Sequence, residues 1–294
     1  RRKRSSSSFG KGRPSYCHSI SPNRCRSTAT LDTNFWILGI IKMGNIDLDF
    51  QPSVPVFDAN IALGRRHDRR VVIDSTEGLI DAMDKTGVER ALVYSPHAED
   101  FDIVEGNSIL MEMIDGESRL VPQFVANPAT GDLDKFADEV SRLGVRSVRM
   151  APVKHLYPFR DWIVGPWLEW MESEGIPLSI PVEQVDVSEL HDTAESHPAL
   201  NVILSEVHYI HAPWAIPMLR KIENTYIETS RFVIADGISR LMSSAGEQRV
   251  LFGSRFPDSS MGHQLYNLHH NSLNEPTLAA ICAGNLDRLL GLES

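Results

Sequence analysis

Eight short apolar runs recur along the chain from residue 54 onward, and each is followed by a loop and an amphipathic stretch. Most runs are largely apolar, as expected for parallel strands that are buried on both faces. The runs begin near Val54, Ala91, Leu120, Val145, Pro177, Asn201, Thr225 and Arg249. Eight β/α units between residues 54 and 292 predict an α/β protein with the (β/α)8 TIM-barrel fold.

Capping residues mark the ends of several predicted helices. Ser, Thr, Asp or Asn favours a helix start, and Gly favours a helix end. The predicted starts and ends are Ser75 and Gly87, Asp161 and Gly175, and Asn285 and Gly291. A doubly wound sheet is the alternative fold, but no G-x-G-x-x-G sequence follows the first run and no Walker A sequence occurs.

The charge of the chain is unevenly distributed. The whole sequence holds 29 Lys and Arg against 39 Asp and Glu, a net charge of −10. Residues 1–42 contain nine basic residues and one acid, which is +8, so the other 252 residues hold 20 bases and 38 acids, which is −18. This split predicts a disordered basic leader over residues 1–42 and a barrel domain over residues 43–294. The Arg- and Ser-rich leader fits either an organellar transit peptide or translated sequence upstream of Met43.

Composition narrows the compartment and the partners. Apolar residues make up 42% and charged residues 23%, which is ordinary for a globular protein. Cys282 is the only cysteine after the leader, so neither a disulfide framework nor a cysteine zinc site is expected there. We expect a cytoplasmic protein, or an organellar one if the leader is a transit peptide. A small-molecule substrate is expected. Neither nucleic acid nor membrane is expected as a partner, because the acidic body repels phosphate. Assembly into a homo-oligomer is possible.

Candidate functional residues follow the predicted strands, because TIM-barrel active sites lie at the carboxyl ends of the strands. His97 follows the second run and is a candidate general acid or base near neutral pH. Arg149 ends the fourth run and is a candidate for binding an anionic group. Strand alternation would direct either Arg149 or Met150 into the barrel.

Five passages of the sequence resemble the amidohydrolase-related family of metal-dependent TIM-barrel hydrolases and decarboxylases, also called amidohydrolase family 2. The likeness covers roughly residues 54 to 292. The passages are VFDANIALG, RLVPQFVANP, GVRSVRMAPVKHLYPF, RVLFGSRFP and GNLDRLLGL. The resemblance implies a (β/α)8 barrel that acts on a small carboxylated or carbonyl compound.

The resemblance also implies a divalent metal, held by H-x-H on strand 1, by His after strands 5 and 6, and by Asp after strand 8. These positions fall on Asn60, Ala62, Pro181, Glu206 and Arg255. Ala and Pro offer no side-chain donor, and the permanent charge of Arg repels a dication. We therefore expect no cofactor and no metal at these positions. Zinc or another divalent metal would need relocated ligands, for which Glu206, His208 and His211 are the candidates.

Two of these positions hold side chains of opposite charge, the acid Glu206 and the cation Arg255. They form an ion pair, or Arg255 faces a substrate carboxylate while Glu206 moves protons. The predicted catalytic residues are Glu206, His208 and His97. The predicted substrate-binding residues are Asn60, Arg149 and Arg255.

Two classes of function remain open. In one, the protein is a metal-free hydrolase or decarboxylase. In the other, it is a catalytically inactive relative that serves as a ligand-binding or oligomer subunit. The enzyme hypothesis loses its support if Glu206 and Arg255 are fully paired and the barrel mouth is packed by Tyr94, Met150 and Pro181.

Overall fold

The computed structural model describes residues 50–293, and the predicted leader and the predicted boundary at residue 43 lie outside the described residues. The described strands are all parallel to their neighbours and lie in the orders β1-β2-β3 and β4 to β9. They are β1 (Phe57–Ala62), β2 (Arg90–Tyr94), β3 (Leu120–Pro122), β4 (Phe124–Ala126), β5 (Val148–Met150), β6 (Leu178–Pro181), β7 (Val202–Ser205), β8 (Thr225–Glu228) and β9 (Val250–Leu251). Each of the eight predicted runs contains a strand or, in the third run, two.

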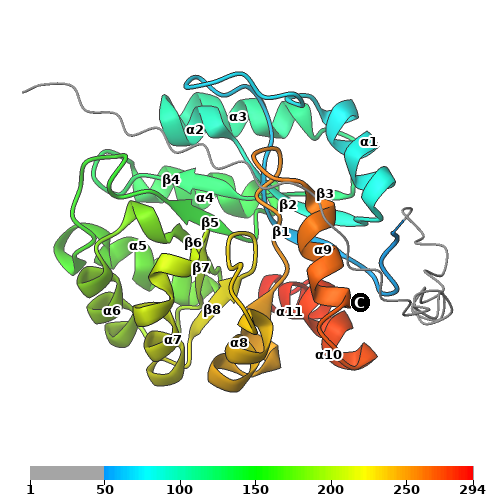
Figure 1. Cartoon of the computed structure of the whole chain (residues 1–294). Coiled ribbons are helices and arrows are strands. Elements are labelled where there is room, and N and C mark those ends of the chain that lie inside the picture. Colours follow the sequence, from blue (N-terminus) through cyan, green and yellow to red (C-terminus); the bar gives the residue numbers. More distant parts are fainter. Residues whose placement is uncertain (1–49, 294) are drawn as a thin grey trace, which may run out of the picture. The chain divides into compact units, whose positions relative to one another are not determined.

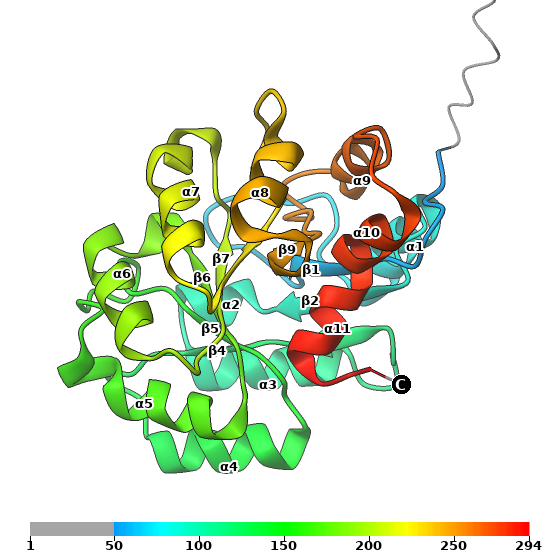
Figure 2. The same cartoon turned by 90° about the horizontal axis from the view of Figure 1, so that it is seen from below.

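Helices lie outside the strands in both views (Figure 1 and Figure 2). They are α1 (Thr76–Thr86), α2 (Pro96–Asp100), α3 (Ile103–Met113), α4 (Leu133–Leu143), α5 (Asp161–Glu174), α6 (Val187–Ser196), α7 (Ala212–Lys221), α8 (Gly237–Ala245), α9 (Met261–His269), α10 (Glu275–Ala279) and α11 (Asn285–Leu290). Short helical turns occur at η1 (Val182–Gln184), η2 (Tyr209–His211), η3 (Glu247–Arg249) and the π-helical η4 (Ala280–Gly284). Among residues 50–293, no helix has the length and apolar character needed to cross a membrane.

The third run is divided into β3 and β4 at Gln123. The backbone N–H of Gln123 still donates to the carbonyl of Val93 on β2 at 2.8 Å. Two residues further along, the side chain of Asn107 in α3 takes the place of the neighbouring strand. Its amide nitrogen donates to the carbonyl of Val125 at 2.9 Å, and its amide oxygen accepts from the N–H of Val125 at 3.0 Å. The amide thereby satisfies backbone groups that would otherwise be buried without partners.

The first and last strands meet through a few backbone contacts that close the ring. The N–H of Ala59 donates to the carbonyl of Phe252, and that of Ala62 to Phe256, each at 2.9 Å. Ile61 and Phe256 form a parallel bridge beyond the end of β9. The chain therefore has the predicted (β/α)8 barrel.

The predicted ends of α1 and α5 are confirmed, and the predicted start at Asn285 is wrong. The Ser75 side chain accepts from the N–H of Gly78 and begins α1, and Gly87 ends it in the left-handed region at φ 72°. Gly175 ends α5 in the same way. Asn285 begins no separate turn, since α10, η4 and α11 follow one another without a break from residue 275 to residue 290.

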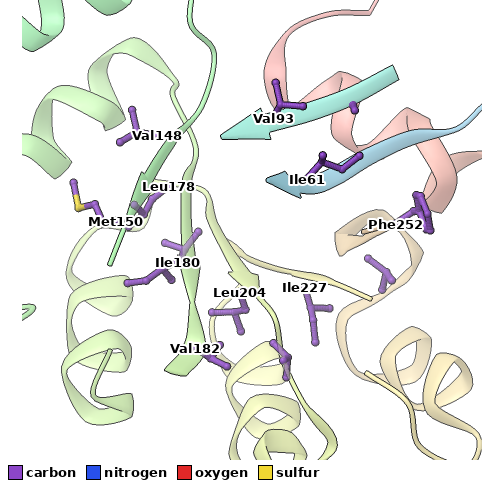
Figure 3. Close-up of a cluster of buried hydrophobic side chains, with 14 of the residues drawn as sticks. Ile61, Val93, Val148, Met150, Leu178, Ile180, Val182, Leu204, Ile227 and Phe252 are labelled. Atoms are coloured by element: carbon purple, nitrogen blue, oxygen red, sulfur yellow. The ribbon is translucent and has the colours of Figure 1, made fainter. Parts of the chain in front are cut away.

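Strand alternation separates an apolar outer face from an interior that holds both an apolar cluster, which includes Phe57, Leu92 and Ile203, and polar side chains. Figure 3 shows Val148, Met150, Leu178 and Ile180 in the hydrophobic cluster that also contains helix residues such as Leu168. Alternate strand residues point to opposite faces, so the positions between them line the barrel interior. These interior positions include Ser147, Arg149, Ser179, Ser205 and Glu228, all of which are buried.

Candidate functional site

The candidate site is the barrel mouth, the end of the barrel where the carboxyl ends of the strands meet. Glu206 directly follows β7, and Arg255 lies four residues beyond β9. The Nε of Arg255 donates to one carboxylate oxygen of Glu206 at 2.6 Å. The expected ion pair is therefore present.

The second carboxylate oxygen of Glu206 is also engaged. It accepts from Nη2 of Arg149 at 3.0 Å, and the Nε of Arg149 donates to Glu99 of α2 at 2.6 Å. The guanidinium of Arg149 also lies 3.9 Å from the centre of the Tyr94 ring, a cation–π contact. With 1% of its side chain exposed, Arg149 is held by two acids and an aromatic ring beyond the reach of solvent.

Glu99 carries a charge in spite of its burial. Burial alone would raise its pKa, but the charges of Arg149 and Lys154 outweigh burial and lower the pKa of Glu99 to about 2. Lys154 donates to Glu99 and to Asp100, each at 2.6 Å. Glu99 is therefore ionised at neutral pH.

On the other side of Glu206, the ion pairs continue through Asp258. This carboxylate binds Arg255 at 3.2 Å, Arg66 at 3.0 Å and Arg69 at 2.5 Å, and its side chain is 4% exposed. Arg66 and Arg69 belong to the loop between β1 and α1, so Asp258 fastens that loop to the segment after β9. Arg69 also pairs with Asp68 at 2.6 Å.

The resulting ion-pair network is continuous across the mouth and electrically balanced. It contains five cations and five carboxylates, so their formal charges cancel. The cations are Arg66, Arg69, Arg149, Lys154 and Arg255, and the carboxylates are Asp68, Glu99, Asp100, Glu206 and Asp258. The ten side chains of the network therefore compensate one another's formal charges.

Glu228, fully buried at the end of β8, lies beneath the network and fixes the backbone around it. One of its oxygens accepts from the N–H of Glu206 at 2.5 Å, from the Asn60 amide at 3.3 Å and from the Ser230 hydroxyl at 2.7 Å. A Cβ on Gly253 would lie 2.3 Å from its other oxygen, so only glycine fits against this carboxylate.

Asp58 on β1 is a second buried acid and is fully enclosed. One of its oxygens accepts from the N–H groups of Asn60 and Ser254, each at 3.0 Å, and the other has no partner among residues 50–293. Burial dominates and raises the pKa of Asp58 to about 7, although its hydrogen bonds act in the opposite direction. Asp58 therefore exchanges its proton near neutral pH.

The backbone itself is strained at the two residues of the central ion pair. Glu206 has φ 58° and Arg255 has φ 60°, the left-handed region that side chains other than Gly seldom adopt. Such conformations cost on the order of 1 kcal/mol each and persist where surrounding contacts hold them. The ion pairs of both residues supply those contacts.

The structure brings some of the predicted site residues together and separates others. Asn60, Arg149, Glu206 and Arg255 share the mouth. His97 instead lies at the first turn of α2, where its ring bonds to His67 at 3.0 Å and to Glu105 at 3.2 Å. Its catalytic role stays a prediction without support from these contacts.

His208 and His211 do not assemble with Glu206 into a metal-binding group. The rings of the two histidines are 6.5 Å apart, and Nδ1 of His211 accepts from the backbone N–H of His208. Both oxygens of Glu206 are held by guanidinium groups. Across residues 50–293, no cluster of three or more His, Cys, Asp or Glu could hold a metal ion.

The residues at the family's metal positions also do not fit a divalent metal. Ala62 packs in an apolar cluster with Tyr94 and Val125. Pro181 is buried and carries no donor atom in its side chain. Glu206 is the one strong ligand, and the neighbouring guanidinium of Arg255 occupies the position that the resemblance gives to an acid.

Of the three side chains whose packing in the mouth would weaken the enzyme hypothesis, two are buried there and Met150 is not. Tyr94 and Pro181 are buried at the strand ends. Met150 lies on the outer face, in the hydrophobic cluster of Figure 3, because Arg149 takes the inward position. A paired guanidinium, not a thioether, therefore fills this part of the mouth.

Sequence reasoning missed four acids that shape the site: Asp58, Glu99, Glu228 and Asp258. Two of them carried a signal, since Asp58 in VFDANIA and Glu228 in TYIETS interrupt apolar strands. An acid within a buried strand is rare unless it has partners. Glu99 and Asp258 lie in polar segments that look like ordinary solvated loops or helix ends.

Sequence comparison identifies one family. The family described as amidohydrolase matches residues 57–292. A comparison with curated proteins gave no significant match.

Several solved structures share the fold at low sequence identity. The 5-carboxyvanillate decarboxylase of Sphingomonas paucimobilis has a TM-score of 0.65 and 15% identity, covering 82% of this chain and 100% of its own. The 2,6-dihydroxybenzoate decarboxylase of Rhizobium has a TM-score of 0.65 and 14% identity, with coverage of 82% and 100%. The 5-carboxyvanillate decarboxylase of Novosphingobium aromaticivorans, complexed with manganese and 4-hydroxy-3-methoxy-5-nitrobenzoic acid, has a TM-score of 0.67 and 12% identity, with coverage of 82% and 97%.

Proposed function

This chain belongs to the amidohydrolase family, and we propose that within it the protein binds a small-molecule ligand without carrying out metal-dependent hydrolysis or decarboxylation. One observation carries the proposal. Both carboxylate oxygens of Glu206, the only strong metal ligand left at the family's metal positions, are bonded to guanidinium groups of Arg149 and Arg255.

Electrostatics supports the same conclusion. A dication about 4 Å from one guanidinium would be repelled by roughly 8 kcal/mol at an effective dielectric constant of about 20. Structural zinc sites with complete ligand sets bind with about 10–16 kcal/mol. The carboxylate of Glu206 would attract the same ion by a comparable amount, so these two guanidinium groups remove the electrostatic advantage that Glu206 would otherwise give a metal.

The roles predicted for individual residues change accordingly. Arg149 is 1% exposed and Asn60 donates to Glu228, so we assign both to positioning the network. Arg255 is 29% exposed and is the member of the central pair that an incoming anion can reach. Glu206 holds Arg149 and Arg255 in place and is not a free general base.

A metal-free hydrolase or decarboxylase of small carboxylated compounds is the second candidate. Arg255 favours it, because its side chain is 29% exposed at the mouth and can meet a substrate carboxylate. Arg255 would bind the substrate carboxylate bidentately after leaving Glu206. The named substrates of the structural neighbours, 5-carboxyvanillate and 2,6-dihydroxybenzoate, define the compounds to test.

Metal analysis and a turnover assay separate these functions. The full-length protein is purified without chelators, and its manganese, zinc and iron contents are measured beside CO2 release from both benzoates. The ligand-binding proposal expects less than stoichiometric metal and no CO2 release with or without added manganese. Stoichiometric metal together with chelator-sensitive turnover would overturn the proposal, and turnover that is insensitive to chelator would favour the second candidate.

A further inference from the structure

A cleft of about 700 Å³ lies beside the barrel mouth. One wall is the connection between α2 and α3, and the other is the loop from β4 to α4 with the first turns of α4. Lys154, His155 and Trp167, from the segments that follow β5, complete the lining. This volume falls within the range that encloses small organic ligands.

The cleft has an aromatic floor and an apolar wall. Trp167 is 4% exposed and its ring centre lies 5.1 Å from that of Phe136. A Cβ on Gly131 would come within 2.9 Å of the Trp167 ring, so the loop rests directly on the indole. Phe101 and Val104 are 67% and 72% exposed, although both line the cleft. A ligand with an apolar body would cover this surface, which water now contacts.

The charges in the lining favour a cation. It contains five carboxylates against two ammonium groups. The carboxylates are Glu99, Asp100, Asp102, Asp132 and Glu139, and the ammonium groups are Lys135 and Lys154. Both lysines are already paired, Lys154 with Glu99 and Asp100 and Lys135 with Asp132.

Two carboxylates remain for a ligand. Within residues 50–293, Asp102 enters no ion pair, and Glu139 has only a contact of 3.8 Å with the exposed Arg142. Asp102 accepts a backbone hydrogen bond at the start of α3, which leaves its other oxygen available. An ammonium group with aromatic neighbours gains from cation–π attraction as well as from these charges.

We propose that this cleft binds an organic amine, a protonated ammonium group carried on an aromatic or other apolar body. This inference rests on the ligand-binding part of the proposed function and specifies the chemical class of the ligand. It shares Glu99 and Lys154 with the ion-pair network but does not require any metal to be absent from the mouth.

Three probes of matched size test the proposal by calorimetric titration of the full-length protein: phenethylamine, phenylpropanoate and phenethyl alcohol. We expect saturable binding of phenethylamine, binding at least about tenfold weaker for the alcohol, and none for the carboxylate. Equal binding of the amine and the carboxylate would overturn the proposal.

Charge-removing variants locate the site. Asp102→Asn and Glu139→Gln should each weaken amine binding several-fold, and Asn retains the capping ability of Asp at the start of α3. Asp186→Asn is the matched control, since Asp186 caps α6 outside the cleft and its substitution should leave binding unchanged. If all three variants bind phenethylamine equally, the cleft is not the site.

The mouth provides an independent check. Glu183→Gln should leave amine binding unchanged, because Glu183 pairs with Arg231 at the end of β6 and does not line the cleft. Amine binding in a protein that also holds stoichiometric metal and releases CO2 would refute the proposed loss of chemistry while sustaining the cleft. Absence of amine binding in a metal-free, inactive protein would refute only the cleft.

Discussion

Replacing Glu206 by Gln removes the central carboxylate of the ion-pair network without changing its size. The substitution leaves Arg149, 1% exposed, with Glu99 as its only carboxylate, and leaves Arg255 with Asp258. Removing one partner of a buried ion pair typically costs about 3–5 kcal/mol. Because Arg255 is 29% exposed and can be partly solvated, we expect a loss of about 3–4 kcal/mol in the free energy of unfolding.

Urea unfolding followed by circular dichroism measures this loss as a lower midpoint at an unchanged m-value. In a thermal melt, the same loss lowers Tm by roughly 6–16 °C for a domain of this size. The matched control is Glu183→Gln, which breaks the exposed pair of Glu183 and Arg231 at 2.9 Å. That variant should lose less than about 1 kcal/mol, as exposed ion pairs do.

A double-mutant cycle shows whether the loss arises from the pair itself. Arg255→Met combined with Glu206→Gln should destabilise the protein by less than the sum of the single variants, since each single change already breaks their shared contact. The reasoning is refuted if Glu206→Gln is no more destabilising than Glu183→Gln. In that case the network would contribute nothing to holding the mouth closed.

Four further outcomes test other parts of the structure. Burial raises the pKa of Asp58 from 3.8 to about 7, so the folded state holds this proton more tightly than the unfolded state. The free energy of unfolding should therefore fall between about pH 4 and pH 7, by up to roughly 4 kcal/mol. Asp58→Asn should flatten this pH dependence in urea titrations. Despite burial, Arg149 and Lys154 lower the pKa of Glu99 from 4.5 to about 2. The stabilisation that ionised Glu99 gives the folded state is complete above pH 4.5 and is lost as the pH falls toward 2. Glu99→Gln should therefore reduce the acid dependence of the free energy of unfolding. Asn107→Leu leaves two buried backbone groups of a strand unpaired and should cost about 2–4 kcal/mol in urea unfolding. Gly106→Ala would place a Cβ 2.2 Å from a backbone nitrogen of α2, and thermal melts should show a loss of about 1–3 kcal/mol or more.

The barrel could be predicted from the sequence because each of its strands lies within a short, largely apolar run of residues. A run such as NVILS is buried on both faces, and this property appears in the composition itself. The division of the third strand could not be predicted in this way. It depends on Asn107, a polar residue of a helix whose amide replaces a neighbouring strand, and only the folded chain brings it to Val125.

The site was predictable only where a position carried an anomaly. Arg255 stood out because the resemblance assigns an acid to it, and its pairing with Glu206 followed from the opposite charges. The roles of Glu99 and Asp258 could not be predicted from the sequence. Glu99 pairs with Arg149, 50 residues away, and Asp258 pairs with Arg66, 192 residues away. An ordinary polar residue becomes a site residue when tertiary contacts bury it beside a cation.

The buried acids beneath the mouth explain why cations must occupy its centre. The backbone N–H of Glu206 donates to the carboxylate of Glu228, and burial together with the charge of Glu206 raises the pKa of Glu228. Without compensating charge, such acids would take up protons or force the strand ends apart. A metal dication is one source of that charge, and the guanidinium groups of Arg149 and Arg255 are another. Arg149 and Arg255 therefore supply, beside Glu206, positive charge that compensates these buried acids.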